Sequence, residues 1–338
     1  MKCYLHIGTE KTATTTLQRF FQINREYLGK QGYLYTESAG KLNNRKLPVL
    51  AYNLDRRDEF TRANNIKTNQ ELAEYKKKIY KNLSREIKKN KNKITIFSSE
   101  HIQSRLTTNE EVNELRNVLE SLGFKEIKII IYLRNPAEIV NSLYSTDIKT
   151  GGLSDKPPSP GNKYYDNICN HKATIERYSS IFGEETIIPR LFIKDEFYNH
   201  SVIEDFLNIT GLKLTDEYQL PGKENESLSL TGLELLRRIN KKIPVFNESG
   251  INPERSNLVN IFEKYFSNDK YQMPDELYMQ YNEAFRDSNE WVRKIYFPEK
   301  KELFPSKVPD NNQNNISTPI NLDEIAEFII HIWKTGKS

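Results

Sequence analysis

Cysteine is scarce in this chain, as are long apolar runs and any strong excess of one charge. The two cysteines among the 338 residues, Cys3 and Cys169, are spaced as neither a metal site nor a disulfide framework would require. Lysine and arginine number 50 against 46 acidic residues, and this balance does not call for nucleic acid as a partner. No apolar run approaches the roughly 18 residues of a membrane span. We therefore expect no metal, no nucleic acid partner and no transmembrane segment.

The beginning of the chain leaves little room for a targeting segment. A strand that leads into Gly8 begins almost at Met1, so we expect no signal peptide. The scarcity of cysteine is consistent with a reducing compartment. The sequence therefore predicts a cytoplasmic protein, bound to a membrane at most at its surface.

Apolar residues, which make up 37% of the chain, alternate between strand-like and helix-like patterns up to about residue 211. After the strand before Gly8, further strands are expected at 33–37, 94–97, 127–133 and 186–192, and helices at 17–29, 70–91, 108–122, 136–149, 168–182 and 200–210. This alternation predicts a three-layer α/β/α fold with a central parallel sheet. Later patterns, at 228–242, 254–266, 275–288 and 322–333, are helical. We expect a single domain over 1–338, with an α/β core over 1–211 and a mostly helical part over 212–338.

The first predicted strand is followed by a polar loop with one lysine and several hydroxyls. Gly8 begins the loop, Lys11 and Thr12 follow, and Thr14 and Thr15 open the next helix. A helix N-terminus presents unpaired N–H groups and a positive dipole end, so this segment is suited to binding an oxyanion. The usual ATP-binding loop has a second glycine before its lysine, which this chain lacks. The alternative interpretation is a capped helix after a strand.

A second group of candidates follows the apolar strand at 127–133. Arg134 stands directly after this strand, and Ser142 lies eight positions later on the next predicted helix. The carboxyl ends of parallel strands are where α/β folds bind ligands, and the planar guanidinium of arginine matches phosphate oxygens. These residues predict a second phosphate site. An arginine in an ion pair and a surface serine are the alternative.

Together these motifs resemble the sulfotransferases that use 3′-phosphoadenylyl sulfate (PAPS), and in particular bacterial carbohydrate sulfotransferase-like proteins. The first loop is similar to the family's G-x-x-K-[ST]-G-[TS]-T loop, which holds the 5′ end of PAPS, although Ala13 replaces the usual glycine. Arg134 and Ser142 resemble the family's 3′-phosphate motif. The segment that begins at Lys223 resembles a third motif, and Lys223 is the candidate for a basic residue that closes over the nucleotide.

The resemblance implies a P-loop-like fold and transfer of a sulfuryl group from PAPS to a hydroxyl or amine, with no metal required. Lys11 would stabilise the leaving oxygen, and a carbohydrate or cell-surface glycan is the expected acceptor. The general base stays open among Glu100, His101, Glu37 and Glu10. Glu100 ranks first because adjacent serines indicate a polar site at the end of strand 94–97.

Two other functions compete with this interpretation. A P-loop nucleotide kinase or other NTPase would use the same strand, loop and helix with Lys11. The missing second glycine argues against it, as does Arg134, which stands where such enzymes place an acidic residue. A non-catalytic nucleotide-binding protein would keep the pocket without the reaction.

Overall fold

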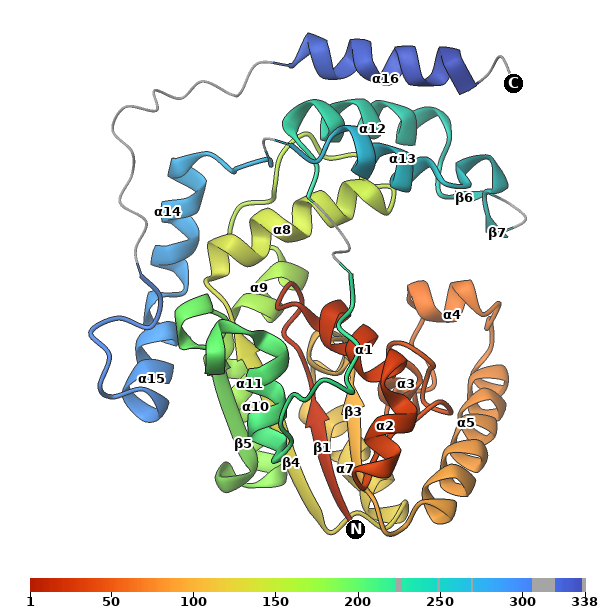
Figure 1. The fold of residues 1–338 in the computed structure, drawn as a ribbon, viewed down its shortest axis with the longest axis vertical. Coiled ribbons are helices and arrows are strands. Elements are labelled where there is room, and N and C mark those ends of the chain that lie inside the picture. The colour runs from red at the N-terminus through yellow and green to blue at the C-terminus, as the bar shows by residue number, and fades with distance from the viewer. Residues whose placement is uncertain (223–226, 248–249, 269, 306–319, 336–338) are drawn as a thin grey trace. The chain divides into compact units, whose positions relative to one another are not determined.

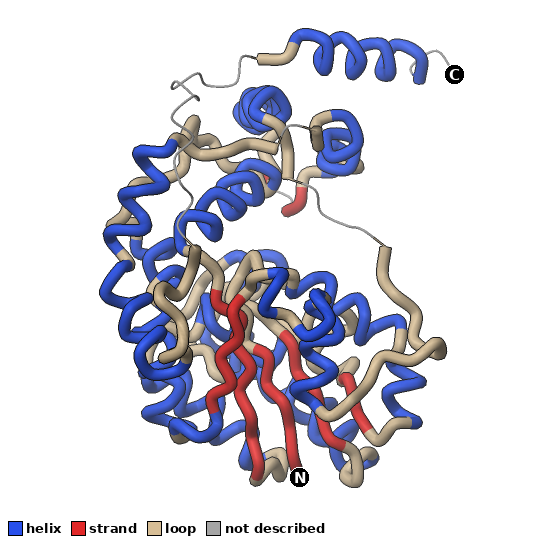
Figure 2. Tube along the Cα trace, turned by 60° about the vertical axis from the view of Figure 1, so that its left-hand side comes forward, coloured by secondary structure: helices blue, strands red, loops and turns tan. Residues whose placement is uncertain are grey.

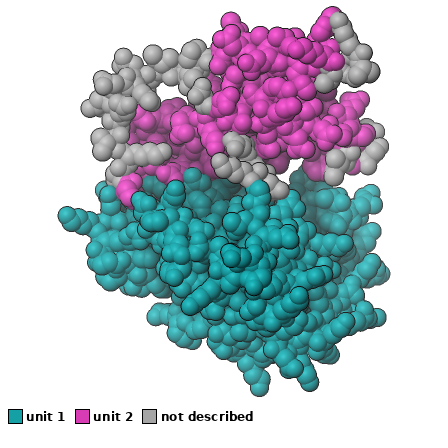
Figure 3. Space-filling model, viewed as in Figure 1, with its two compact units in different colours: residues 1–135, 163–223, 285–304 teal, residues 136–162, 224–284, 305–338 magenta. Residues whose placement is uncertain are grey.

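The computed structural model describes residues 1–222, 227–247, 250–268, 270–305 and 320–335. The chain divides into two compact units, which Figure 3 colours separately. The first unit holds residues 1–135, 163–223 and 285–304, and the second holds residues 136–162, 224–284 and 305–338. The central sheet and the predicted anion-binding loop both belong to the first unit.

The first unit is built on a five-stranded parallel sheet (Figures 1 and 2). Its strands are β1 (Lys2–His6), β2 (Tyr33–Tyr35), β3 (Ile94–Ser98), β4 (Glu126–Leu133) and β5 (Ile187–Leu191). Their order across the sheet is β2-β3-β1-β4-β5, and each neighbouring pair is parallel. The predicted parallel sheet is thus confirmed. The first strand lies at its centre, so the loop after β1 leaves the middle of the sheet's carboxyl edge.

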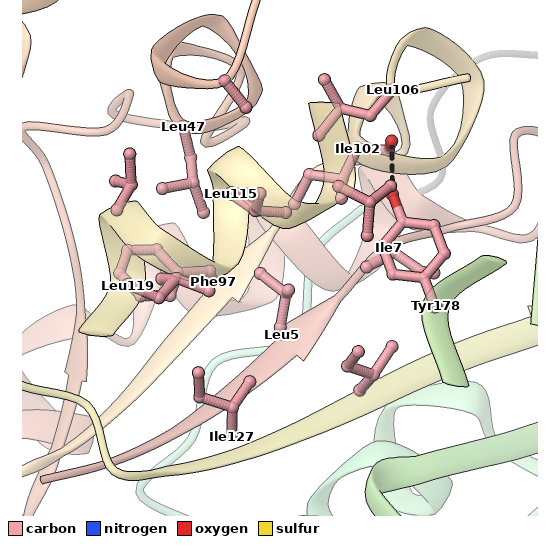
Figure 4. Close-up of a cluster of buried hydrophobic side chains, with 14 of the residues drawn as sticks. Leu5, Ile7, Leu47, Phe97, Ile102, Leu106, Leu115, Leu119, Ile127 and Tyr178 are labelled. Carbon is pink, nitrogen blue, oxygen red and sulfur yellow. Dashed lines mark hydrogen bonds between the residues drawn. The ribbon is translucent and has the colours of Figure 1, made fainter. Parts of the chain in front are cut away.

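Alternate residues of the strands face two separate apolar cores. Leu5 and Ile129 pack into one core with residues of α3 (Lys46–Leu50), α5 (Asn69–Lys89), α7 (Asn109–Ser121) and α10 (His171–Phe182). Figure 4 shows part of this core, where the Tyr178 hydroxyl donates to the Ile102 carbonyl oxygen at 2.8 Å. Tyr4 and Ile130 face the other core with residues of α1 (Thr14–Ile23), α2 (Arg25–Lys30) and α11 (Val202–Thr210). Helices therefore cover both faces of the sheet, as predicted.

Shorter elements complete the first unit. Its other helices are α4 (Glu59–Ala63), α6 (His101–Arg105), α9 (Lys163–Cys169) and α15 (Arg286–Tyr296), with 3-10 turns η1 (Glu184–Thr186), η2 (Lys194–Glu196) and η3 (Tyr198–His200). Helix α6 begins two residues after β3 ends. Its position places the residues at the end of β3 beside the loop after β1.

The second unit is mostly helical, and its described elements are α8 (Pro136–Lys149), α12 (Leu230–Lys242), α13 (Leu258–Tyr265), α14 (Asp275–Ala284), α16 (Leu322–Thr335), η4 (Pro253–Arg255), β6 (Phe246–Asn247) and β7 (Gly250–Ile251). Its core joins α8, α12 and α13 through Tyr144, Leu233 and Phe262, and Phe328 of α16 packs against it. The predicted helices are therefore present.

Three sequence predictions need correction. The helix expected over 17–29 is two helices, because the Asn24 side chain leaves the helical pattern to donate to the Gln219 carbonyl oxygen and accept from the Gln219 N–H, both at 2.8 Å. The helix expected over 275–288 ends at Ala284, and α15 begins at Arg286. The antiparallel pair β6–β7 was not predicted, since each strand has only two residues.

Candidate functional site

The loop between β1 and α1 is fixed to the neighbouring strand β4 by backbone hydrogen bonds. The Ile7 N–H donates to the Ile130 carbonyl oxygen at 3.0 Å, and the Thr9 N–H donates to that of Tyr132 at 3.1 Å. In return, the Tyr132 N–H donates to the Gly8 carbonyl oxygen at 2.7 Å. The loop therefore continues the sheet pairing past the end of β1, and its conformation is set by the sheet.

The loop reaches α1 through left-handed backbone conformations. Gly8, Lys11 and Ala13 have φ values of 109°, 66° and 57°, and the Gly8–Thr9 peptide bond is cis. Ala13 occupies the N-cap position of α1, and no side chain of the described residues caps that helix. The first N–H groups of α1 therefore lack the side-chain acceptor that usually satisfies them, which suits them to an oxyanion. Ala13 adopts the conformation that the usual glycine would favour.

The threonine hydroxyls predicted to hold phosphate differ in their surroundings. Thr12 is fully buried, and its hydroxyl donates to the Thr9 carbonyl oxygen at 2.6 Å. Thr14 is also buried, whereas Thr15 is partly exposed on the first turn of α1. The Thr12 proton thus holds the loop closed, which leaves the first turn of the helix as the part that can donate to an anion.

Arg134 connects the two predicted phosphate motifs. Its guanidinium Nη1 donates to the Lys11 carbonyl oxygen at 2.8 Å and lies over the Phe192 ring, 5.5 Å from its centroid. His171, which opens α10, lies with Nε2 2.8 Å from the Arg134 carbonyl oxygen. Burial lowers the pKa of His171 to about 4, so its ring is neutral and donates this bond from Nε2. The structure therefore brings Arg134 to the Lys11 loop and holds the arginine's backbone in place.

Two other predicted cofactor-binding residues are not part of this arrangement in the first unit. Ser142 lies on α8, in the second unit, where its carbonyl oxygen accepts from the Thr146 hydroxyl at 3.3 Å. Its convergence with Arg134 stays a prediction. Lys223 lies outside the described residues, so the nucleotide-closing role predicted for it is likewise still a prediction.

Glu100 lies against the loop at the end of β3. A Cβ atom placed on Gly8 would be 3.1 Å from Glu100 Cα and 3.2 Å from its Cβ. The two carboxylate oxygens accept hydrogen bonds from Gln18 Nε2 at 2.8 Å and from Asn43 Nδ2 at 2.9 Å. Burial raises the pKa of Glu100, because removal from water disfavours its charged form. A carboxylate with a raised pKa beside an anion-binding loop has the character of a general base.

His101, the first residue of α6, is the neighbouring candidate. Its Nε2 lies 3.7 Å from the Glu100 carboxylate, and its Nδ1 is buried without a hydrogen-bond partner among the described residues. Burial, together with the positive charges of Arg45 and Arg105, lowers the pKa of His101 to about 3. The ring is therefore neutral near pH 7, and it is a much weaker base than an unperturbed histidine.

The remaining two candidates for the base are held in ion pairs. Glu10 accepts from Arg105 Nη1 at 3.2 Å and from the Tyr164 hydroxyl at 3.0 Å, and the same arginine pairs with Glu59 at 2.7 Å. Glu37 pairs with Arg25 at 3.0 Å on the surface. The structure thus places Glu100 and Glu10 at the loop, and Glu37 in a surface pair with α2.

Sequence reasoning missed the residues that support the candidates. Gln18, Asn43, Arg105 and His171 were not singled out, although each contacts a predicted site residue. Gln18 offered a signal, because it is a polar residue between Leu17 and Phe20, in a stretch of α1 that is almost entirely buried. The other three act through contacts with residues distant in the chain, and no local pattern marks them.

Two further searches of the described residues gave negative results. No group of three or more histidine, cysteine, aspartate or glutamate side chains is arranged there to hold a metal ion. Within the same residues, no helix combines the length and apolar character needed to cross a membrane.

Comparisons with known proteins give distant similarities. No protein-family model matches the chain. A protein of Archaeoglobus fulgidus, described as uncharacterized, is 25% identical over 212 residues, which cover 61% of this chain. The chain spans 56% of the length of that relative. Among solved structures, a sulfotransferase from Alicyclobacillus acidocaldarius is similar over 72% of this chain and 92% of its own, with a TM-score of 0.41 and 16% identity. The functional inference therefore rests on the residues of the site.

Proposed function

We propose that the protein is a sulfotransferase that moves a sulfuryl group from PAPS to a hydroxyl or amine of a carbohydrate acceptor, with residues 1–338 acting as one domain. The observation that carries this proposal is the hydrogen bond from Arg134 Nη1 to the Lys11 carbonyl oxygen, at 2.8 Å. It joins a 5′-phosphate loop and a 3′-phosphate arginine at one edge of the sheet. A ligand with phosphates at both ends of a nucleoside fits these two groups better than a nucleoside triphosphate does.

The donor would be held mainly by the loop and the first turn of α1. Backbone N–H groups from Gly8 to Thr15 and the hydroxyls of Thr14 and Thr15 face the 5′ side in this proposal. Lys11 stabilises the negative charge that grows on the bridging oxygen as the sulfur–oxygen bond breaks. Arg134, with Ser142 and Lys223, holds the 3′-phosphate. The proposed chemistry uses charge stabilisation by these residues and no metal.

Glu100 is the general base that we propose. Its raised pKa brings it nearer to neutral pH, where a base is most effective, and its backbone packs against Gly8. His101 has a pKa of about 3 and therefore gains little by taking a proton near pH 7. The ion pair between Glu10 and Arg105 favours a role for Glu10 in holding the loop.

Isothermal titration calorimetry with adenosine 3′,5′-bisphosphate, the product left after sulfuryl transfer, tests the donor site. We expect binding without Mg²⁺, and a loss of roughly tenfold to a hundredfold in affinity in Arg134→Ala, because a charged hydrogen bond contributes about 1.5–3 kcal/mol. Arg116→Ala is the matched control, since Arg116 pairs with Glu120 on an exposed face of α7.

Three results of this titration would count against the proposal. They are no binding of the bisphosphate, binding unchanged in Arg134→Ala, and tighter binding of ATP that depends on Mg²⁺. The last result would favour the kinase or NTPase alternative.

A further inference from the structure

The Glu100 carboxylate is held by two amide side chains from different parts of the chain. Gln18 comes from α1, the helix whose N-terminus begins at the loop, and it is only 2% exposed. Asn43 comes from the segment before α3 and is partly exposed. Each amide donates to a different oxygen, Gln18 to Oε2 at 2.8 Å and Asn43 to Oε1 at 2.9 Å. Both oxygens of the carboxylate are therefore engaged as acceptors.

We propose that Gln18 and Asn43 are positioning residues, which keep Glu100 ionised and orient it to receive the proton of the acceptor hydroxyl. This inference rests on the proposed sulfotransferase function. An amide NH₂ group can only donate, so it stabilises a carboxylate, whereas a protonated carboxyl would place its own O–H against one of the two donors. The two amides thus select the form of Glu100 that can act as a base.

The charges around Glu100 explain why such support is needed. Burial disfavours the ionised form, and the negative charge of Glu10 acts in the same direction, so both raise the pKa of Glu100. The positive charge of Arg45 and the bond from Gln18 oppose them. His101 lies 3.7 Å away but is neutral, so it adds no positive charge. The two amides therefore supply stabilisation that the neighbouring ionisable groups only partly provide.

The proposed step balances without any further reactant. The acceptor oxygen forms a bond to sulfur as the bond between sulfur and the bridging oxygen breaks, and the electron pair of that bond stays on the 5′-phosphate beside Lys11. The acceptor proton passes to a Glu100 carboxylate oxygen. The products are a sulfate ester, adenosine 3′,5′-bisphosphate and a protonated Glu100.

An NMR titration of the full-length protein with isotope-labelled glutamate carboxyl groups tests the inference directly. The Glu100 signal is identified by its loss in Glu100→Gln. We expect Gln18→Met and Asn43→Ala each to move the Glu100 titration midpoint upward by about one pH unit, because each removes a hydrogen bond to a charged group. Gln22→Met is the matched control on α1, where Gln22 contacts Arg19 and not Glu100. Midpoints unchanged in both variants would overturn the proposal.

The rate of sulfate transfer provides the second readout. With radiolabelled PAPS and a panel of p-nitrophenyl glycosides, we expect the acidic limb of the single-turnover rate to shift upward with the NMR midpoint, about tenfold in rate per unit. A shifted midpoint with an unshifted rate profile would overturn the catalytic role of the two amides. Failure of the wild-type protein to bind adenosine 3′,5′-bisphosphate would instead overturn the proposed function, while the NMR titration would still report on the amides. Because Asn43 is partly exposed, its variant tests the inference even if Gln18→Met does not fold.

Discussion

Replacing Gly8 with alanine perturbs the contact between the anion-binding loop and Glu100. Gly8 has a φ of 109°, and an added Cβ would lie 3.1 Å from Glu100 Cα, which is closer than real Cβ contacts allow without a shift. A left-handed backbone costs a residue with a Cβ roughly 1–2 kcal/mol. Overpacking a tight site typically adds about 1–3 kcal/mol. We therefore expect Gly8→Ala to lower the free energy of unfolding by roughly 2–5 kcal/mol.

Gly32→Ala is the matched control for this change. Gly32 also has a positive φ, 83°, but a Cβ there meets no atom of the described structure within 4 Å. Both substitutions restrict the unfolded chain equally, by about 0.4–1 kcal/mol, so their difference isolates the crowding against Glu100. Urea denaturation followed by circular dichroism should show Gly8→Ala to be less stable than Gly32→Ala by about 1–3 kcal/mol. Equal stabilities of the two variants would refute the close packing of loop and Glu100.

Three further predictions concern the loop and the buried charges. Ala13→Gly should stabilise the protein by up to about 1 kcal/mol in urea denaturation, because it removes a left-handed alanine at φ 57° and gives back part of the gain as unfolded-state entropy; a destabilised variant would contradict this. Asp205 is fully buried and accepts from the Tyr132 hydroxyl at 2.8 Å and from Arg190, so Asp205→Ala should cost roughly 3–5 kcal/mol, whereas the exposed Asp195→Ala should cost less than about 0.5 kcal/mol. Similar losses for the two variants would argue against a buried ion pair. Burial lowers the pKa of His6 to about 3, so the stability that its neutral ring contributes is complete above pH 6.5 and is lost as the pH falls toward 3. At pH 5 this loss is about 2 kcal/mol, and His6→Phe should show a shallower decline in unfolding free energy between pH 7 and pH 5 than the wild type; parallel declines would contradict the assignment.

Local patterns were sufficient to predict the architecture of the first unit. The apolar run of β4 and the alternating strands and helices before residue 211 depend on periodicity, which the structure preserves. The motif at Gly8 and Lys11 likewise combines a strand end with a helix start, and both features are local. The break at Asn24 could not be predicted in this way, because its partner, Gln219, lies 195 residues away in the sequence.

The candidate site was predictable to the extent that its residues stand at the ends of strands. Glu100 and Arg134 both follow a strand directly, and a parallel sheet brings such positions to one edge. The contact between Arg134 and Lys11 and the support of Glu100 by Gln18 and Asn43 depend on side-chain orientation, which sequence spacing does not encode. His171 illustrates the same limit, since a buried histidine that bonds to a backbone carbonyl has no sequence signature.

Sulfate transfer from radiolabelled PAPS to the panel of p-nitrophenyl glycosides measures the proposed activity itself. We predict transfer without added metal, abolished in Lys11→Ala and reduced by roughly 10²–10⁴ in Glu100→Gln, as expected for loss of a general base. Arg116→Ala, which changes an exposed ion pair on α7, should transfer at the wild-type rate. Binding of adenosine 3′,5′-bisphosphate with no transfer to any acceptor, or transfer that persists in Lys11→Ala, would contradict the proposal that this chain is a sulfotransferase acting through its first loop.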